Sequence, residues 1–293
     1  MTITRRHLPT STEASASTDA LCATCGVQRP LVSPTQPCPI CDDERQYVGS
    51  DGQRWITLDD VARLNHNTLT ELEPGLTSIR TAPAFAIGQH ALLVATPHGN
   101  VLWDCLSLVD DATVQAVQAL GGVAAIAISH PHFYGVMRAW SRAFGGVPIW
   151  IHEADRAWIP TPAPEVRTWS GSTMRLLGDL TLVHVGGHFE GSQILHWPAG
   201  ADGRGAVLAG DQPNLASDRR WFAFMRSFPN YIPLAADEAE RVVAAFRPLA
   251  FGRLYSWTPD RVMRSDAKAS LERSLVRHVR ALRGEHDAVA ARG

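Results

Sequence analysis

The chain has 293 residues, of which 45% are hydrophobic, and this is enough to bury one large core or two modest ones. Its 27 Lys and Arg residues nearly balance its 29 Asp and Glu residues, so we expect no basic stripe and no nucleic-acid partner. No apolar run reaches the ~18–20 residues that a membrane-spanning helix requires, so we expect no membrane partner either.

The N-terminal residues 1–18 are polar and rich in Ser and Thr, and we expect them to form a disordered tail. They lack the apolar stretch of a secretory signal, which makes a cytoplasmic location the expectation. In that compartment cysteines are kept as thiols, so they are more often metal ligands than disulfide partners.

Four cysteines form two Cys-x-x-Cys pairs, Cys22 with Cys25 and Cys38 with Cys41, and 12 residues separate the pairs. This spacing can place four thiolates on a tetrahedron around zinc, so residues 19–48 are predicted to form a zinc ribbon. Two disulfides or an iron ion are the alternatives. The pairs resemble rubredoxin knuckles, but rubredoxins have a much longer segment between them, so zinc is preferred.

Residues 49–75 are interpreted as a connector with a short helix that begins near Thr57 or Asp59. From residue 76 onward, short apolar runs predict strands at 85–87, 91–95, 101–103, 123–128, 147–151, 180–185, 194–197, 206–209 and 250–255. Helices are predicted at 111–120, 136–144, 237–246 and 262–283. Turn signals separate the early strands, which favours antiparallel hairpins there. The later strands alternate with helices, and the two patterns together favour a layered α/β sandwich.

Candidate metal ligands follow three of the predicted strands. His130 and His132 come directly after the run 123–128, His188 follows a strand and a Gly-Gly turn, and Asp211 follows Gly210 after another strand. Neutral imidazole is a good ligand for zinc and other first-row metals. The order of these strand ends predicts a metal site at one edge of the sheets. Most of the 12 histidines are not candidates, and His90 is expected at the surface or in a hairpin.

From about residue 80 to 255 the order of motifs resembles the metallo-β-lactamase fold superfamily. The resemblance rests on Val101-Leu102-Trp103-Asp104, His130-x-His132, Gly187-His188-x-x-Gly191-Ser192 and Gly210-Asp211. It implies a four-layer αβ/βα sandwich over 76–293, with the metal site at one edge between two sheets. Most such proteins are hydrolases that use one or two zinc or iron ions.

The sequence also departs from the superfamily pattern, which usually reads His-x-His-x-Asp-His. Here Tyr134 replaces the Asp and Gly135 replaces the third His, and no last His is present near 251–253. The missing residues are those that build a second metal site. The resemblance therefore implies one metal, held by His130, His132 and His188 with Asp211.

Supporting roles are expected for two neighbours of these ligands. Tyr134 is either a hydrogen-bond donor to a developing oxyanion or a packed aromatic residue. Asp104 either supports the site from behind the ligands, as its counterpart in the superfamily does, or caps the next segment.

The expected activity is mononuclear metal-dependent hydrolysis of an ester, thioester, lactone or amide of a small molecule by a metal-bound hydroxide, with Asp211 orienting the water or acting as base. The alternatives are an Fe(II) oxygenase and a non-catalytic binding protein on a degenerate fold.

The aromatic segments 158–169 and 221–234 are expected either to form the walls of the pocket or to pack elsewhere, including in a homodimer interface. The sequence does not decide whether the ribbon braces this pocket or binds a partner.

Overall fold

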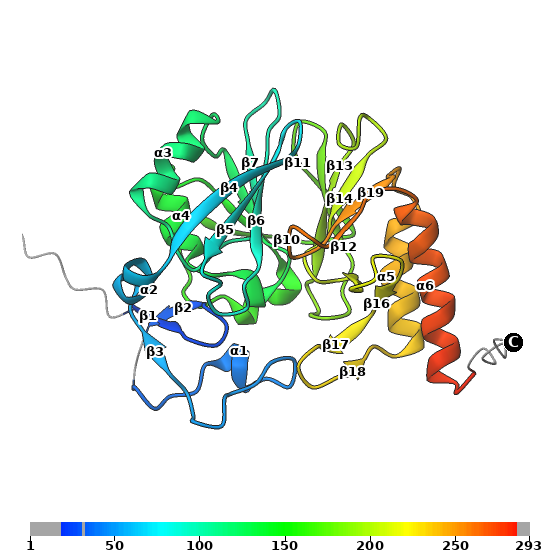
Figure 1. The fold of residues 1–293 in the computed structure, drawn as a ribbon, viewed down its shortest axis with the longest axis horizontal. Coiled ribbons are helices and arrows are strands. Elements are labelled where there is room, and N and C mark those ends of the chain that lie inside the picture. Colours follow the sequence, from blue (N-terminus) through cyan, green and yellow to red (C-terminus); the bar gives the residue numbers. More distant parts are fainter. Residues whose placement is uncertain (1–18, 31–32, 286–293) are drawn as a thin grey trace, which may run out of the picture.

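Two β-sheets face each other at the centre of the molecule, and helices cover the outer face of each sheet (Figure 1). The structure is a computed structural model that describes residues 19–30 and 33–285. The tail predicted at 1–18 therefore lies outside the described residues. None of the described helices is long and apolar enough to cross a bilayer.

The first sheet has seven strands in the order β10-β9-β8-β7-β6-β5-β4. Strands β4 to β7 are antiparallel, as the turn signals predicted, whereas β7 to β10 are parallel. Helices α3 (Asp111–Ala119) and α4 (Met137–Ala143) connect the parallel strands and lie outside this sheet. The strands are β4 (His66–Glu73), β5 (Leu76–Ala82), β6 (His90–Val94), β7 (Val101–Trp103), β8 (Ala125–Ala127), β9 (Ile149–His152) and β10 (Val166–Trp169).

The second sheet has six strands in the order β11-β12-β13-β14-β19-β20, with only β14 and β19 parallel. Helices α5 (Ala236–Phe246) and α6 (Ala267–Leu282) cover its outer face (Figure 1). The strands are β11 (Thr173–Leu177), β12 (Leu180–His184), β13 (Gln193–Trp197), β14 (Ala206–Leu208), β19 (Arg253–Tyr255) and β20 (Val262–Met263). Two small hairpins lie between β14 and α5 in the chain. They are β15 (Asn214–Leu215) with β16 (Phe222–Ala223), and β17 (Met225–Ser227) with β18 (Ile232–Pro233).

Three hydrophobic cores correspond to the three interfaces between four layers. One core lies between the sheets and includes Trp103 and Leu195. The second joins the first sheet to α3, α4 and the ribbon, and the third joins the second sheet to α5 and α6, where Leu271 and Leu275 are buried. The predicted four-layer αβ/βα sandwich is confirmed.

The N-terminal ribbon consists of β1 (Asp19–Cys22), β2 (Gln28–Pro30) and β3 (Trp55–Ile56) with the short helix α1 (Pro39–Asp42). Strands β3 and β4 both come from the segment interpreted as a connector, so this segment contributes one strand to the ribbon's sheet and one to the first sheet of the sandwich. Helix α2 (Leu58–Leu64) lies between them, and its first turn is capped because the Thr57 hydroxyl accepts a hydrogen bond from the Asp60 amide at 3.1 Å.

Three local predictions were wrong. Residues 85–87 form a turn instead of a strand, and the last helix begins at Ala267 because Val262–Met263 pair with β19. The third prediction was wrong only in part, because His90 lies in the hairpin of β5 and β6 but is buried instead of at the surface. Its Nε2 donates to the Ser256 carbonyl oxygen at 2.8 Å and its Nδ1 accepts from the Ser78 hydroxyl at 3.0 Å, so the ring bridges the two sheets.

Candidate metal centres

The fold brings His130, His132, His188 and Asp211 together at the carboxyl ends of strands from both sheets. His130 follows β8, and His132 lies in the 3-10 helix η1 (Pro131–Phe133). His188 lies in the turn after β12, and Asp211 lies in the turn after β14. All four side chains are buried. The structure thus brings together the four ligands that the sequence predicted.

The distances between the four donor atoms suit a single metal ion. His188 Nε2 lies 3.1 Å from His132 Nδ1, and Asp211 Oδ2 lies 3.4 Å from His130 Nε2 and 3.7 Å from His188 Nε2. Ligands at about 2.0–2.1 Å from a tetrahedral zinc ion are separated by about 3.3 Å. His130 Nε2 and Asp211 Oδ1 are buried without a hydrogen-bond partner in the described part of the chain. The residues present therefore fit a bound metal.

The charges at this site favour the metal-binding forms of most of these groups. Burial lowers the pKa of His132 well below its ordinary value and lowers the pKa of His188 to about 4. Burial alone would also lower the pKa of His130, but the charge of Asp211 raises it. Burial alone would raise the pKa of Asp211, and the charges of His130 and His188 lower it below its ordinary value. Two imidazoles are therefore neutral and the carboxylate is ionised before a metal binds.

Asp104 lies behind the ligands and orders the turn that carries His130. Its Oδ1 accepts a hydrogen bond from the Ser129 amide at 2.7 Å, and the Ser129 hydroxyl lies 2.9 Å from His130 Nδ1. Asp104 itself adopts a left-handed φ of 63° at the end of β7. Burial raises its pKa to about 7. The contact is of the kind that orients ligating histidines.

Two residues near the histidines are buried away from solvent. Tyr134 packs completely within the second core, its hydroxyl has no hydrogen-bond partner in the described residues, and burial raises its pKa well above the ordinary value. The oxyanion role of Tyr134 stays a prediction.

Asp155, in the 3-10 helix η2 (Glu153–Trp158), accepts a hydrogen bond from the Gly191 amide at 2.7 Å, and burial raises its pKa to about 7.

The positions expected for a second metal site hold no ligands among the described residues. Gly135 has a φ of +49°, and a Cβ there would lie 2.4 Å from the Leu106 carbonyl oxygen, so the backbone leaves no room for a histidine. After β19, the Ser256 hydroxyl donates to the Gly210 carbonyl oxygen at 3.1 Å. Among the described residues, the ligand set at this site is therefore the three histidines with Asp211.

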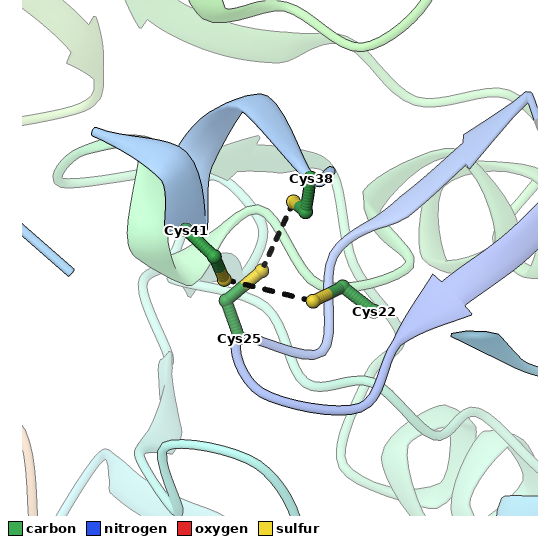
Figure 2. Close-up of side chains that lie close together, drawn as sticks. All are labelled: Cys22, Cys25, Cys38 and Cys41. Carbon is green, nitrogen blue, oxygen red and sulfur yellow. Dashed lines mark hydrogen bonds between the residues drawn. The ribbon is translucent and has the colours of Figure 1, made fainter. Parts of the chain in front are cut away.

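The four ribbon cysteines converge on one point (Figure 2). Cys22 Sγ lies 3.6 Å from Cys41 Sγ, and Cys25 Sγ lies 3.8 Å from Cys38 Sγ, so neither pair forms a disulfide. Sulfurs about 2.3 Å from a tetrahedral zinc ion are separated by about 3.8 Å. The thiols therefore fit a structural metal ion, and the disulfide alternative is wrong.

A cavity of about 480 Å³ lies beside the histidine site and includes His132 and Asp211 in its lining. Phe228 and Pro229 line it, as predicted for the segment 221–234, whereas no residue of 158–169 does. Trp158 instead packs against Phe189. The other wall residues come from the ribbon and from loops of the sandwich: Thr24, Arg45, Gln46, Tyr47, Ala86, Ile87, Phe133, Asn214, Trp257 and Arg261.

Comparison with known proteins places the chain in a family. Uncharacterized protein YmaE of Bacillus subtilis (strain 168) is 44% identical over 268 residues, which cover 90% of this chain and 97% of that protein. The chain belongs to the YmaE family. No protein-family model matches it.

Solved structures similar to this YmaE-family member include several metallo-β-lactamases. Rm3 metallo-β-lactamase matches with a TM-score of 0.52 and 16% identity over 78% of this chain and 97% of that chain. A HARLDQ-motif metallo-β-lactamase of Cronobacter sakazakii matches with a TM-score of 0.51 and 17% identity over 77% and 96%. MEM-A1, a subclass B3 enzyme from a soil metagenome library, matches with a TM-score of 0.50 and 18% identity over 76% and 99%. At this identity they show the fold, and the metallo-β-lactamase fold is confirmed.

Sequence reasoning did not single out two residues that border the histidine site of this YmaE-family chain. Asp155 lies three residues after the end of β9, so the strand-end signal that identified the metal ligands could also have found it. Arg45 lies four residues after Cys41 and lines the cavity. Nothing local in the sequence connects it with His188, because that contact joins residues far apart in the chain.

Proposed function

We propose that this protein is a mononuclear metallohydrolase that cleaves an ester, thioester, lactone or amide bond of a small molecule. The observation that carries the proposal is the convergence of three imidazoles and one carboxylate, whose ligand atoms all lie within 4.8 Å of one another, beside a cavity of about 480 Å³. Three His ligands are the donor set of catalytic zinc sites that keep a position open for water. A cavity of this size fits a small molecule.

A zinc ion held by these ligands would lower the pKa of water toward ~7 and polarise a carbonyl oxygen. With the three imidazoles as its ligands, that ion would keep one tetrahedral position open for water. Asp211 lies beside the three imidazoles, and its Oδ1 has no hydrogen-bond partner in the described residues. Since Asp211 also lines the cavity, this free oxygen can orient the attacking water and accept its proton. Asp104 and Ser129 hold the His130 ring in place during this step.

The cavity walls favour a substrate that combines an apolar group with a negative charge. Phe228, Tyr47 and Trp257 supply aromatic surface. Arg261 donates to the Leu215 carbonyl oxygen at 2.5 Å and to the Ser217 hydroxyl at 3.4 Å, and its charge also helps to lower the pKa of the neighbouring Asp260. With a divalent ion bound at the histidines, that ion and Arg261 would make the potential in the cavity favourable for an anionic group.

The test is a hydrolysis screen with the zinc-loaded protein on chromogenic esters, thioesters, lactones and amides. Each substrate is used in two forms, one neutral and one anionic. His132→Ala is the matched variant, because it removes one ligand. We expect turnover that depends on His132 and a lower KM for the anionic members. Equal rates for both proteins on every substrate would contradict a metallohydrolase.

Iron(II) is the competing occupant of the histidine site, because His and carboxylate ligands with open positions also suit iron oxygenases. Metal analysis of the purified protein distinguishes the two. Iron at the histidine site, with oxygen uptake and no hydrolysis, would favour the oxygenase. Full metal loading with neither activity would favour a binding protein.

A further inference from the structure

The four-cysteine ribbon forms part of the cavity beside the histidine site. Arg45, Gln46 and Tyr47 follow the last cysteine and line the same cavity as His132 and Asp211. The ribbon is thus a wall of the site instead of a separate appendage.

Arg45 contacts three consecutive residues of the turn that carries the ligand His188. Its Nη1 lies 3.5 Å from the His188 carbonyl oxygen and 3.0 Å from Glu190 Oε2, and its guanidinium carbon lies 4.2 Å from the centroid of the Phe189 ring. The side chain is only 5% exposed. One buried cation therefore fixes the backbone, the ring and the carboxylate of this turn together.

The position of Arg45 is in turn fixed within the ribbon and against the sandwich. Asp43 Oδ1 accepts a hydrogen bond from Arg45 Nε at 2.8 Å, which orients the guanidinium. On either side of Arg45, the carbonyl oxygens of Glu44 and Gln46 accept hydrogen bonds from Asn230 Nδ2 at 2.8 and 3.0 Å. The segment therefore cannot move without breaking contacts to both the ribbon and the sandwich.

We propose that Arg45 is a positioning residue through which the ribbon holds His188 in its metal-binding orientation. This inference rests on the proposed function only in requiring that the histidine site binds a metal. Partners of this kind, one step removed from the metal, change its affinity about 10- to 100-fold when they are replaced. Because binding free energies are reciprocal, a metal at the histidine site also stabilises the contact between Arg45 and the His188 turn.

The test compares Arg45→Met, Arg45→Lys and Glu190→Gln with the unaltered protein. The last variant is safe for folding, because the Glu190 side chain is 58% exposed. Arg253→Met is the matched control, since Arg253 forms a similarly buried ion pair with Glu73 away from the cavity. Zinc affinity at each site is measured by competition with a chromophoric chelator, and Co²⁺ absorption reports the geometry of the histidine site.

We expect Arg45→Met to weaken zinc binding at the histidine site about 10- to 100-fold and to change the Co²⁺ spectrum, with the cysteine site unaltered. Arg45→Lys and Glu190→Gln should have smaller effects in the same direction, and Arg253→Met should leave affinity and spectrum unchanged even where it lowers the Tm. Unaltered affinity and spectrum in folded Arg45→Met would overturn the inference.

The two proposals fail in different ways. Metal binding that depends on Arg45, without hydrolysis of any substrate, would contradict the metallohydrolase and leave the positioning role standing. Hydrolysis and metal binding that are unchanged when Arg45 is replaced would contradict the positioning role and leave the metallohydrolase standing. No metal at the histidine site of the unaltered protein would overturn both.

Discussion

His188 Nε2 lies 3.1 Å from His132 Nδ1, although the two residues follow strands of different sheets. Two ring nitrogens buried this close together need a shared proton or a shared cation. The Asp211 carboxylate adds a negative charge beside them. The candidate cation site thus forms where the edges of the two sheets meet, and neither sheet supplies all of its residues.

Asp211→Asn removes the carboxylate and keeps the shape of the side chain. We expect zinc affinity at the histidine site to fall by about 10-fold or more, and turnover to fall by about 10²–10⁴-fold, because the group that orients water is lost. Zinc titration and kcat measure the two effects. Asp218→Asn is the control, because Asp218 pairs with Arg220 at the surface. An Asp211→Asn protein with normal turnover would contradict this role.

Asp104→Ala should destabilise the fold by about 1–3 kcal/mol, because it leaves the buried Ser129 amide without its acceptor. Asp104→Asn keeps an acceptor oxygen and tolerates the left-handed backbone. Since Asn keeps the hydrogen bond to the Ser129 amide, Asp104→Asn should cost less than about 1 kcal/mol. Urea unfolding of both variants tests this, and equal losses would show that the Ser129 contact is unimportant.

Gly135→Ala should cost about 3 kcal/mol, because strain at a φ of +49° adds to a contact of 2.4 Å with the Leu106 carbonyl oxygen. Gly145→Ala is the control. Gly145 has a φ of +84° but open space around it, so strain alone should cost about 1 kcal/mol. Denaturant unfolding of the two variants separates packing from strain, and similar losses would argue against the close approach.

His90 should make stability depend on pH between about 4 and 6.5. Burial lowers its pKa to about 4 in the folded protein, from 6.5. The contribution is therefore fully present above pH 6.5, and about 3 kcal/mol is lost as the pH falls toward 4. His90→Gln should flatten this part of the profile of unfolding free energy against pH. The metal-ligand histidines are the same in both proteins, so an unchanged profile in the variant would contradict the assignment.

The strand ends that carry the ligands could be predicted from sequence, because short buried runs such as β8 and β14 show in the pattern of apolar residues. The cysteine site was also predictable, since its ligands lie close together in the chain. What could not be predicted depends on long-range packing. The Arg45 contact with Glu190 and the burial of His90 beside Ser256 join segments that no local periodicity connects.

Metal content of the purified protein and of His132→Ala, determined by elemental mass spectrometry, tests the central claim most directly. We expect two metal ions per chain in the unaltered protein, one at the cysteines and one at the histidine site, and one per chain in the variant. One metal ion per chain in both proteins would mean that only the ribbon binds metal, and the metallohydrolase would be contradicted.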